Sequence, residues 1–227
     1  ECLDLPEMVY IKRKVELTPQ QKKYYKELKT RMVMQAAGEE VTAVNAAVNM
    51  NKLLQISAGA VYTDNGQALE FDIKHRYKVL MEAIQETSSK VLVFVPFKHT
   101  IGILSRRLTS DGISNAVIQG DVPVNKRTEI FKAFQEQSDP RVLVVQPAAA
   151  SHGVTLTAAN TVVWWAPTSS LETYLQANAR IHRAGQKNKC TVVQLHGAPV
   201  EQHVYRLLDD RIDVHTKVID LYKELLD

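Results

Sequence analysis

The segment of this chain best suited to chemistry is QANARIHRAGQ, residues 176–186. At about 100° per residue, Gln176, Arg180 and Arg183 would share one narrow face of a helix. Two guanidinium groups one turn apart repel each other, so the spacing favours an anion between them. A polyphosphate fits, because arginine stays ionised and offers paired donors to phosphoryl oxygens during transfer. The alternative is an exposed helix whose arginines form ion pairs with nearby Asp or Glu.

Other conspicuous side chains have simpler structural interpretations. Trp164 and Trp165 could stack on bases, but their β-branched neighbours predict that at least one lies in the core. His182 falls on a different helical face from the arginines and is predicted to be structural. Cys190 is predicted to be a small buried apolar residue. No pair of His or Cys residues with ligand spacing has a matching second pair, so we expect no metal site.

The elements that must position these residues begin with an N-terminal section. Residues 1–17 are expected to be extended, and Thr18-Pro19 predicts the start of a helix that reaches about Met34. A second helix is expected over 41–56, and a polar turn at 63–66 follows it. We therefore predict an extended segment and small helical appendage over 1–69, and a second domain over 70–227.

Beyond residue 70, helical and strand patterns alternate. Compact apolar runs predict strands at 90–95, 115–118, 142–145, 161–165 and 191–195. A helix is expected over about 171–183, and one amphipathic helix over about 200–225 should pack on the body. Continuous apolar strands are typical of parallel sheets covered on both faces, so the fold class is α/β with a three-layer parallel sheet flanked by helices. Ligands of such sheets are expected beyond the carboxyl ends of the strands.

Composition excludes several classes of protein. With 227 residues, 45% apolar and 23% charged, the chain is neither disordered nor fibrous. Its apolar runs are far shorter than the roughly 18 to 20 residues that span a bilayer, and only two cysteines are present, so a cytoplasmic location is expected. Lys and Arg number 28 against 25 Asp and Glu, too even a balance to establish an anionic partner. Basic residues do cluster over 11–31, where they could meet phosphates or form a solvated helix face.

Ordered sequence blocks carry a resemblance to a known family. KVLVFVPF at 90–97 resembles motif IV, Gly120, Arg127 and Phe134 match a Gly, Arg, Phe block, and SHGVTLTAANTVVWW at 151–165 resembles motif V. QANARIHRAGQKN at 176–188 resembles motif VI, and residues 5–28 and 51–59 resemble the stretch leading into the domain. Together the blocks resemble the second RecA-like lobe of Swi/Snf-type ATPases of helicase superfamily two.

This resemblance implies a role for each matched residue. Arg180 and Arg183 would reach ATP bound on an opposite, first lobe as arginine fingers. Gln176, Gly153 and Thr155 would lie near the nucleotide. Three further residues, Lys98, His99 and Arg127, would approach the backbone of the tracked nucleic acid, which is expected to be DNA rather than RNA. Such backbone contacts carry little sequence information.

The chain also departs from the family pattern. Pro147 stands where a threonine usually contacts phosphate, Ser151 stands where a glycine is usual, and Thr155 replaces the usual asparagine. The acidic and Trp-Asn-Pro segment is replaced over 166–171. These changes weaken the expectation of DNA contacts at motif V and suggest a phage or prophage branch.

A complete motor also needs a phosphate loop ending in Gly-Lys-Ser/Thr and acidic residues for magnesium. None of the nine glycines is followed by lysine. The chain is therefore expected to be half of an ATPase, inactive alone, with ATP and Mg²⁺ used by a parent that carries the first lobe on the N-terminal side.

Two alternatives remain at this stage. The first is a catalytically idle lobe that binds DNA or a partner protein. The second is an unrelated doubly wound enzyme acting on a small molecule. No G-x-G-x-x-G fingerprint follows a predicted strand, so the sequence gives the second little support.

Overall fold

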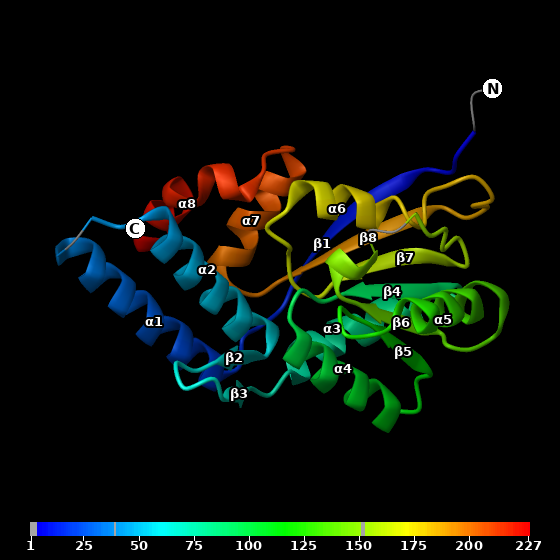
Figure 1. Cartoon of the computed structure of the whole chain (residues 1–227), viewed down its shortest axis with the longest axis horizontal. Helices are drawn as coiled ribbons and strands as arrows, with labels where there is room; N and C mark the ends of the chain where they lie inside the picture. The colour runs from blue at the N-terminus through cyan, green and yellow to red at the C-terminus, as the bar shows by residue number, and fades with distance from the viewer. Residues whose placement is uncertain (1–3, 39, 151–152) are drawn as a thin grey trace.

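The computed structural model describes residues 4–38, 40–150 and 153–227 of the chain. Its centre is a six-stranded, entirely parallel sheet in the order β1-β8-β7-β4-β6-β5 (Figure 1). The strands are β1 (Met8–Lys14), β4 (Lys90–Phe94), β5 (Asn115–Ile118), β6 (Val142–Val145), β7 (Ala159–Trp164) and β8 (Cys190–His196). The predicted α/β class with a parallel sheet is confirmed.

Helices cover both faces of this sheet. On one face lie α3 (Lys74–Gln85) and α4 (Lys98–Ser110), and on the other lie α5 (Val124–Glu136), α6 (Leu171–Asn178) and α7 (Pro199–Asp209). Successive side chains of a strand point to opposite faces, so Val93 and Trp165 belong to one core while Leu92 and Trp164 belong to the other. The central strands are buried on both sides, which explains their continuous apolar sequences.

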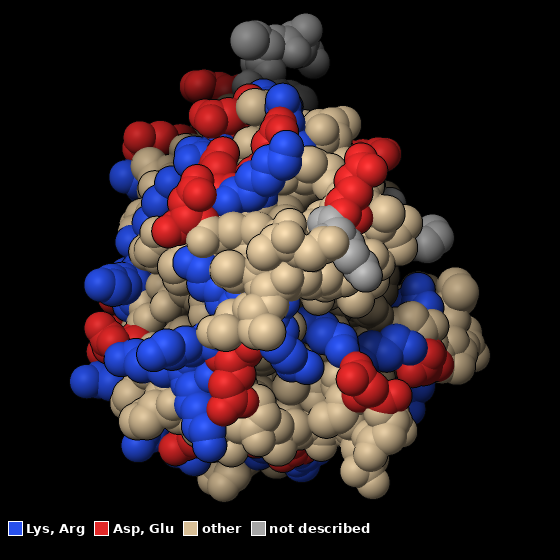
Figure 2. Space-filling view, turned by 90° about the vertical axis from the view of Figure 1, so that its left-hand side faces the viewer, with Lys and Arg blue, Asp and Glu red and all other residues tan. Residues whose placement is uncertain are grey.

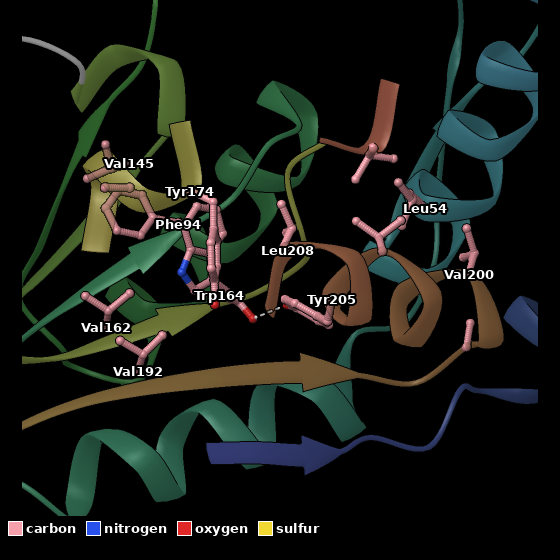
Figure 3. Close-up of a cluster of buried hydrophobic side chains, with 14 of the residues drawn as sticks. Leu54, Phe94, Val145, Val162, Trp164, Tyr174, Val192, Val200, Tyr205 and Leu208 are labelled. Carbon is pink, nitrogen blue, oxygen red and sulfur yellow. Dashed lines mark hydrogen bonds between the residues drawn. The ribbon is translucent and has the colours of Figure 1, made fainter. Parts of the chain in front are cut away.

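Both tryptophans lie in these cores, as the neighbouring residues predict for at least one of them. Trp164 stacks on Phe94 with ring centroids 4.8 Å apart, and its carbonyl accepts a hydrogen bond of 3.2 Å from the Tyr205 hydroxyl (Figure 3). The indole N–H of Trp165 donates to the Ala58 carbonyl at 2.7 Å. Both indole rings are fully buried and expose no face to solvent, so neither can stack on a base.

A helical layer lies beyond the carboxyl ends of β7 and β8 (Figure 1). It contains α1 (Pro19–Gly38), α2 (Ala43–Ala58), the short η2 (Val214–Lys217) and α8 (Val218–Leu226), with a hairpin of β2 (Ala60–Tyr62) and β3 (Ala68–Glu70) beside it. The Tyr222 hydroxyl donates to the Met32 carbonyl at 3.2 Å, and the Val200 amide donates to the Tyr25 hydroxyl at 3.3 Å. These bonds join the N-terminal helices to the C-terminal ones.

The N-terminal section differs in one respect from its prediction. Residues 8–14 form β1, the outer strand of the main sheet, and pair along their whole length with β8. The extended segment is therefore part of the sheet rather than of the appendage. The domain boundary at residue 69 remains a prediction.

The C-terminal section differs as well, because two helices replace the single helix expected over 200–225. The chain turns after Asp209, where Arg211 adopts a left-handed φ of 58°. The Asp213 side chain then accepts a hydrogen bond of 2.9 Å from the His215 amide and caps the start of η2. No helix within the described ranges is both long and apolar enough to cross a bilayer.

Candidate nucleotide and nucleic-acid sites

The helix that carries the motif VI residues is shorter than predicted. Helix α6 begins at its N-cap, Ser170, and ends at Asn178. Beyond that point the Arg180 carbonyl accepts the amide of Leu156, at 2.9 Å, instead of an amide one turn further along α6. Gln176 remains on the helix and donates to Glu172 at 2.8 Å. The prediction that Gln176, Arg180 and Arg183 share one helical face is therefore wrong.

The two arginines still lie close together, but their environments differ. Arg180 is only 3% exposed, whereas Arg183 is partly exposed. Burial, and secondarily the positive charge of Arg183, hold the pKa of Arg180 below its usual value. Arg183 donates from Nη1 to the Gly153 carbonyl at 3.1 Å and from Nε to the Ala179 carbonyl at 3.2 Å. No carboxylate in the described ranges lies within 4.0 Å of Arg183.

This arginine pair lies at the amino ends of the strands. Leu156, which bonds to Arg180, comes shortly before β7, and Gln186 donates to the carbonyl of Ala159, the first residue of β7, at 2.9 Å. The arginine pair therefore lies at the opposite edge of the sheet from the carboxyl ends of the strands, where ligands are expected. Among the other predicted nucleotide contacts, Gly153 adjoins Arg183, while Thr155 is exposed and has no described contact with either arginine.

A second polar group lies at the carboxyl edge, where β4, β5 and β6 end. The Nζ atom of Lys98 is 2.7 Å from an oxygen of Asp121. Arg127 donates to the carbonyls of Gly120 at 2.8 Å and Val122 at 2.7 Å. The Gly120 amide donates to the side chain of Gln146 at 3.1 Å. The structure therefore brings Lys98 and Arg127 to one loop, residues 119–122.

His99, the third predicted nucleic-acid contact, points elsewhere. Its Nε2 lies 2.6 Å from Glu70, at the end of β3, and its ring meets Tyr62 edge to face at 6.1 Å between centroids. Arg106 contacts the same carboxylate at 3.4 Å. His99 thus fastens the start of α4 to the hairpin rather than joining Lys98.

One short segment connects the two edges. Its described parts are Gln146 at the end of β6, the 3₁₀ turn η1 (Pro147–Ala150), and the stretch from Gly153 to the start of β7. Gln146 contacts the 119–122 loop, and Gly153 contacts Arg183. Ser151, where the sequence departs from the family pattern, lies outside the described residues.

Two other predictions concern His182 and Cys190. The His182 Nε2 lies 2.7 Å from the Pro6 carbonyl, consistent with a structural role. Cys190 is fully buried, and burial raises the pKa of its thiol. Within the described part of the chain, no group of three His, Cys, Asp or Glu residues could hold a metal ion.

The basic cluster over 11–31 divides between β1 and α1. Lys12 pairs with Asp209 at 3.0 Å, and Lys22 lies 3.7 Å from Glu16. The face that includes the helical layer shows many basic side chains interspersed with acidic ones (Figure 2). Phosphate binding by this cluster therefore remains one of two interpretations, beside a solvated helix face.

Asp121 is the residue of the carboxyl edge that the sequence analysis overlooked. Its signal was its position: it directly follows the Gly of the Gly, Arg, Phe block, in a loop after a strand. Loops of this kind meet at one edge of a parallel sheet, but their pairwise contacts depend on strand order.

Comparison with known proteins gives a consistent result. The helicase conserved C-terminal domain matches residues 75–185. The chain is 28% identical over 136 residues to the ATP-dependent helicase fft2 of Schizosaccharomyces pombe, covering 60% of this chain and 11% of that protein. It is 29% identical over 150 residues to a Caenorhabditis elegans homologue of a SWI/SNF-related regulator of chromatin containing DEAD/H box 1, covering 66% of this chain and 15% of the other. The chain thus spans a small part of these relatives.

Solved structures share the fold. The C-terminal part of the Fun30 ATPase domain superposes with a TM-score of 0.77 at 18% identity, covering 98% of each chain. The Sulfolobus solfataricus SWI2/SNF2 ATPase core in complex with dsDNA gives 0.78 at 21% identity, covering 98% of this chain and 50% of that one. These likenesses include the sheet and the helical layer, because they cover nearly the whole chain.

Proposed function

Because residues 75–185 of this chain belong to the family of helicase conserved C-terminal domains, we propose that the chain is the second motor lobe of a Swi/Snf-type, ATP-driven DNA translocase or helicase. The observation that carries this proposal is Arg183. It is a partly exposed guanidinium, next to a second one, with no carboxylate near it in the described ranges. A guanidinium with no carboxylate within 4.0 Å in the described ranges, such as that of Arg183, is suited to an anion supplied from outside the lobe.

The terminal phosphate of ATP held on a first lobe fits this site. ATP with Mg²⁺ would supply the phosphoanhydride bond that is cleaved. Arg183 makes two hydrogen bonds to carbonyls, which leave its positive charge uncancelled, and its Nη2 makes no hydrogen bond with the described residues. Arg183 therefore stabilises charge on the phosphate directly. Arg180, buried beneath the surface, adds its positive field and fixes Leu156 through its carbonyl.

The remaining nucleotide residues have smaller roles in this proposal. Gly153 holds Arg183 in place through its carbonyl, and the exposed Thr155 is available to the sugar or base. Gln176 orients Glu172 on α6 and lies at the side of the site.

The carboxyl edge is the proposed contact with nucleic acid. Lys98 is the cation that meets phosphate, and its side chain is 45% exposed. Arg127 is a positioning residue, because its Nε and Nη2 atoms donate hydrogen bonds to carbonyls of the 119–122 loop. His99 acts by fixing the start of α4, which carries Lys98. Double-stranded DNA is proposed as the partner, since a solved relative of this fold contains it.

The segment from Gln146 to Gly153 suggests how the two edges communicate. A displacement of Arg183 toward phosphate pulls on the Gly153 carbonyl at one end of this segment. Gln146, at the other end, holds the loop beside Lys98. Closure of the two lobes on ATP would thus shift the nucleic-acid contacts in each cycle.

The central experiment is ATP turnover by this chain joined to a first motor lobe, with DNA present. We expect Arg183→Ala to lower turnover by about 10³-fold or more, as loss of an arginine finger does. Arg183→Lys should restore little, because lysine lacks the paired donors. Lys187→Ala, an exposed cation in the same loop, is the matched control and should leave turnover unchanged. DNA affinity should be the same in all three variants, and full turnover by Arg183→Ala would refute the assignment.

A catalytically idle module that binds DNA or a partner protein is the second candidate. Burial of Arg180 favours it, because a side chain 3% exposed is not placed to touch a phosphate on another lobe. The same joined protein separates the two functions. A motor lobe gives DNA-stimulated turnover, whereas an idle module gives DNA binding without it, and the chain alone should hydrolyse no ATP in either case.

A further inference from the structure

The exposed ion pair at the carboxyl edge joins the proposed DNA-binding cation to a carboxylate of the same chain. Lys98 and Asp121 lie 2.7 Å apart, with side chains 45% and 69% exposed. Asp121 comes from the loop after β5, and Lys98 opens α4 after β4. The pair is therefore made by two separate loops at the same edge of the sheet.

The loop that carries Asp121 is held from two sides. Arg127 on α5 bonds the carbonyls on either side of Asp121, those of Gly120 and Val122. Gln146 accepts the amide of Gly120 at 3.1 Å. Because these three hydrogen bonds already fix the loop backbone, Asp121 loses only side-chain freedom when it pairs with Lys98.

The position of Gly120 shows how near the Lys98 and Gln146 side chains lie to the loop. A Cβ atom built on Gly120 would lie 3.7 Å from the Gln146 Oε1 and 4.0 Å from the Lys98 Nζ. The Lys98 ammonium therefore lies directly over the loop backbone, with the Asp121 carboxylate beside it.

A carboxylate oxygen at 2.7 Å occupies the position that a phosphate oxygen would take against the same ammonium. We propose that Asp121 is an intramolecular competitor with the DNA backbone for Lys98 and sets the affinity of this edge for phosphate. DNA phosphate and this carboxylate then compete for the positive charge of Lys98. This inference rests on the proposed function, since it assumes that Lys98 meets nucleic acid.

The competition predicts two measurable changes when the carboxylate is neutralised. Asp121→Asn should tighten binding of duplex DNA by about five-fold, the ratio expected for the stronger exposed ion pairs. It should also steepen the dependence of log K on log salt by about 0.9, because one more cation then releases a counterion from the DNA.

The experiment is titration of a short fluorescent DNA duplex with this chain, followed by anisotropy between about 50 and 200 mM salt. Asp111→Asn is the matched control. It removes the same charge from another exposed pair, with Arg107 at 3.3 Å, at the opposite end of α4. The double variant Lys98→Ala/Asp121→Asn tests whether the gain depends on Lys98. Circular dichroism checks that each variant is folded.

The inference is supported if Asp121→Asn binds more tightly than Asp111→Asn and the double variant loses the gain. Equal affinities for the two single variants would overturn it while leaving the proposed function intact. A gain that persists in the double variant would also overturn it, because repulsion of DNA by Asp121 would then not act through Lys98. If no variant bound DNA even at low salt, the proposed DNA contact would fail together with the inference.

Discussion

The most buried ion pair in the described structure predicts a large effect of one small substitution. Arg76 on α3 and Glu201 on α7 are 3% and 0% exposed and meet through two bonds of 2.7 and 2.8 Å. Arg76 also donates to the Trp165 carbonyl. Glu201 accepts the amides of Gly197 at 2.6 Å and Ala198 at 3.1 Å. The pair thus ties α3, the end of β7 and the start of α7 together.

Replacing Glu201 by Gln keeps the shape of the side chain but removes its charge. The buried guanidinium of Arg76 then has no anionic partner among its described contacts, which costs about 3–5 kcal/mol. Chains of this kind are stable by roughly 5–15 kcal/mol in total. We therefore expect Glu201→Gln to remove a large share of the free energy of unfolding.

Equilibrium denaturation in urea, followed by circular dichroism, measures this loss. Glu224→Gln is the matched control, since Glu224 is exposed and pairs with Arg206 at 2.7 Å, and it should cost less than about 1 kcal/mol. In an Arg76→Met background the Glu201 carboxylate has already lost its cation, and Glu201→Gln then strands no charge, so the further loss caused by Glu201→Gln should shrink or vanish. A loss as small as that of the control, or an equal loss in both backgrounds, would refute the reasoning.

Two further predictions concern single residues of the helical layer. Burial raises the pKa of Tyr25 to about 12, above its ordinary value near 10, so its contribution to stability is complete below pH 10 and is lost as pH rises toward 12. Urea denaturation between pH 10 and 12 should show the free energy of unfolding falling as pH rises, and falling less steeply in Tyr25→Phe than in the unsubstituted chain. The same slope in both proteins would contradict the prediction. Gly59 has a φ of +126°, and an added Cβ would lie 2.5 Å from Ile73, so Gly59→Ala should cost about 1–3 kcal/mol. Gly38→Ala, with nothing within 4 Å, should be nearly neutral in the same assay, and equal costs would count against this account.

The sequence predicted the interior of the sheet well because burial on both faces leaves a strong local signal. Val142–Val145 is a continuous apolar run, and all four residues are fully buried in β6. Parallel strands of this kind need no alternation of polar residues, so each run could be recognised without knowledge of its neighbours.

The outer strand and the end of α6 were not predictable in this way. Lys12, Arg13 and Lys14 give β1 a polar sequence, and its strand character depends on pairing with β8 far along the chain. Helical spacing continues past Asn178, but a long-range bond from Leu156 to the Arg180 carbonyl takes the place of helix continuation. In both cases a contact distant in sequence overrides the local pattern.

The candidate sites were predictable by residue type rather than by arrangement. The motif VI resemblance singled out Arg183, and the structure places it against Gly153 from the motif V block. The burial of Arg180 depends on packing that helical spacing does not encode. The pairing of Lys98 with Asp121 depends on strand order, which brings the loops after β4 and β5 within reach across β6. The roles of these residues remain predictions.

The position of β1 has a consequence for how separate molecules meet. Its outer side ends the sheet, and an unpaired strand is a template on which another chain can add. A second copy docking there would have to dehydrate three consecutive charged residues, Lys12 to Lys14, two of which are already engaged with Asp209 and Glu86. Removal of the N-terminal residues up to and including Lys14 would uncover β8, whose Val192 and Leu195 are fully buried. The charged edge of the sheet would then be replaced by an apolar edge that favours association with other chains.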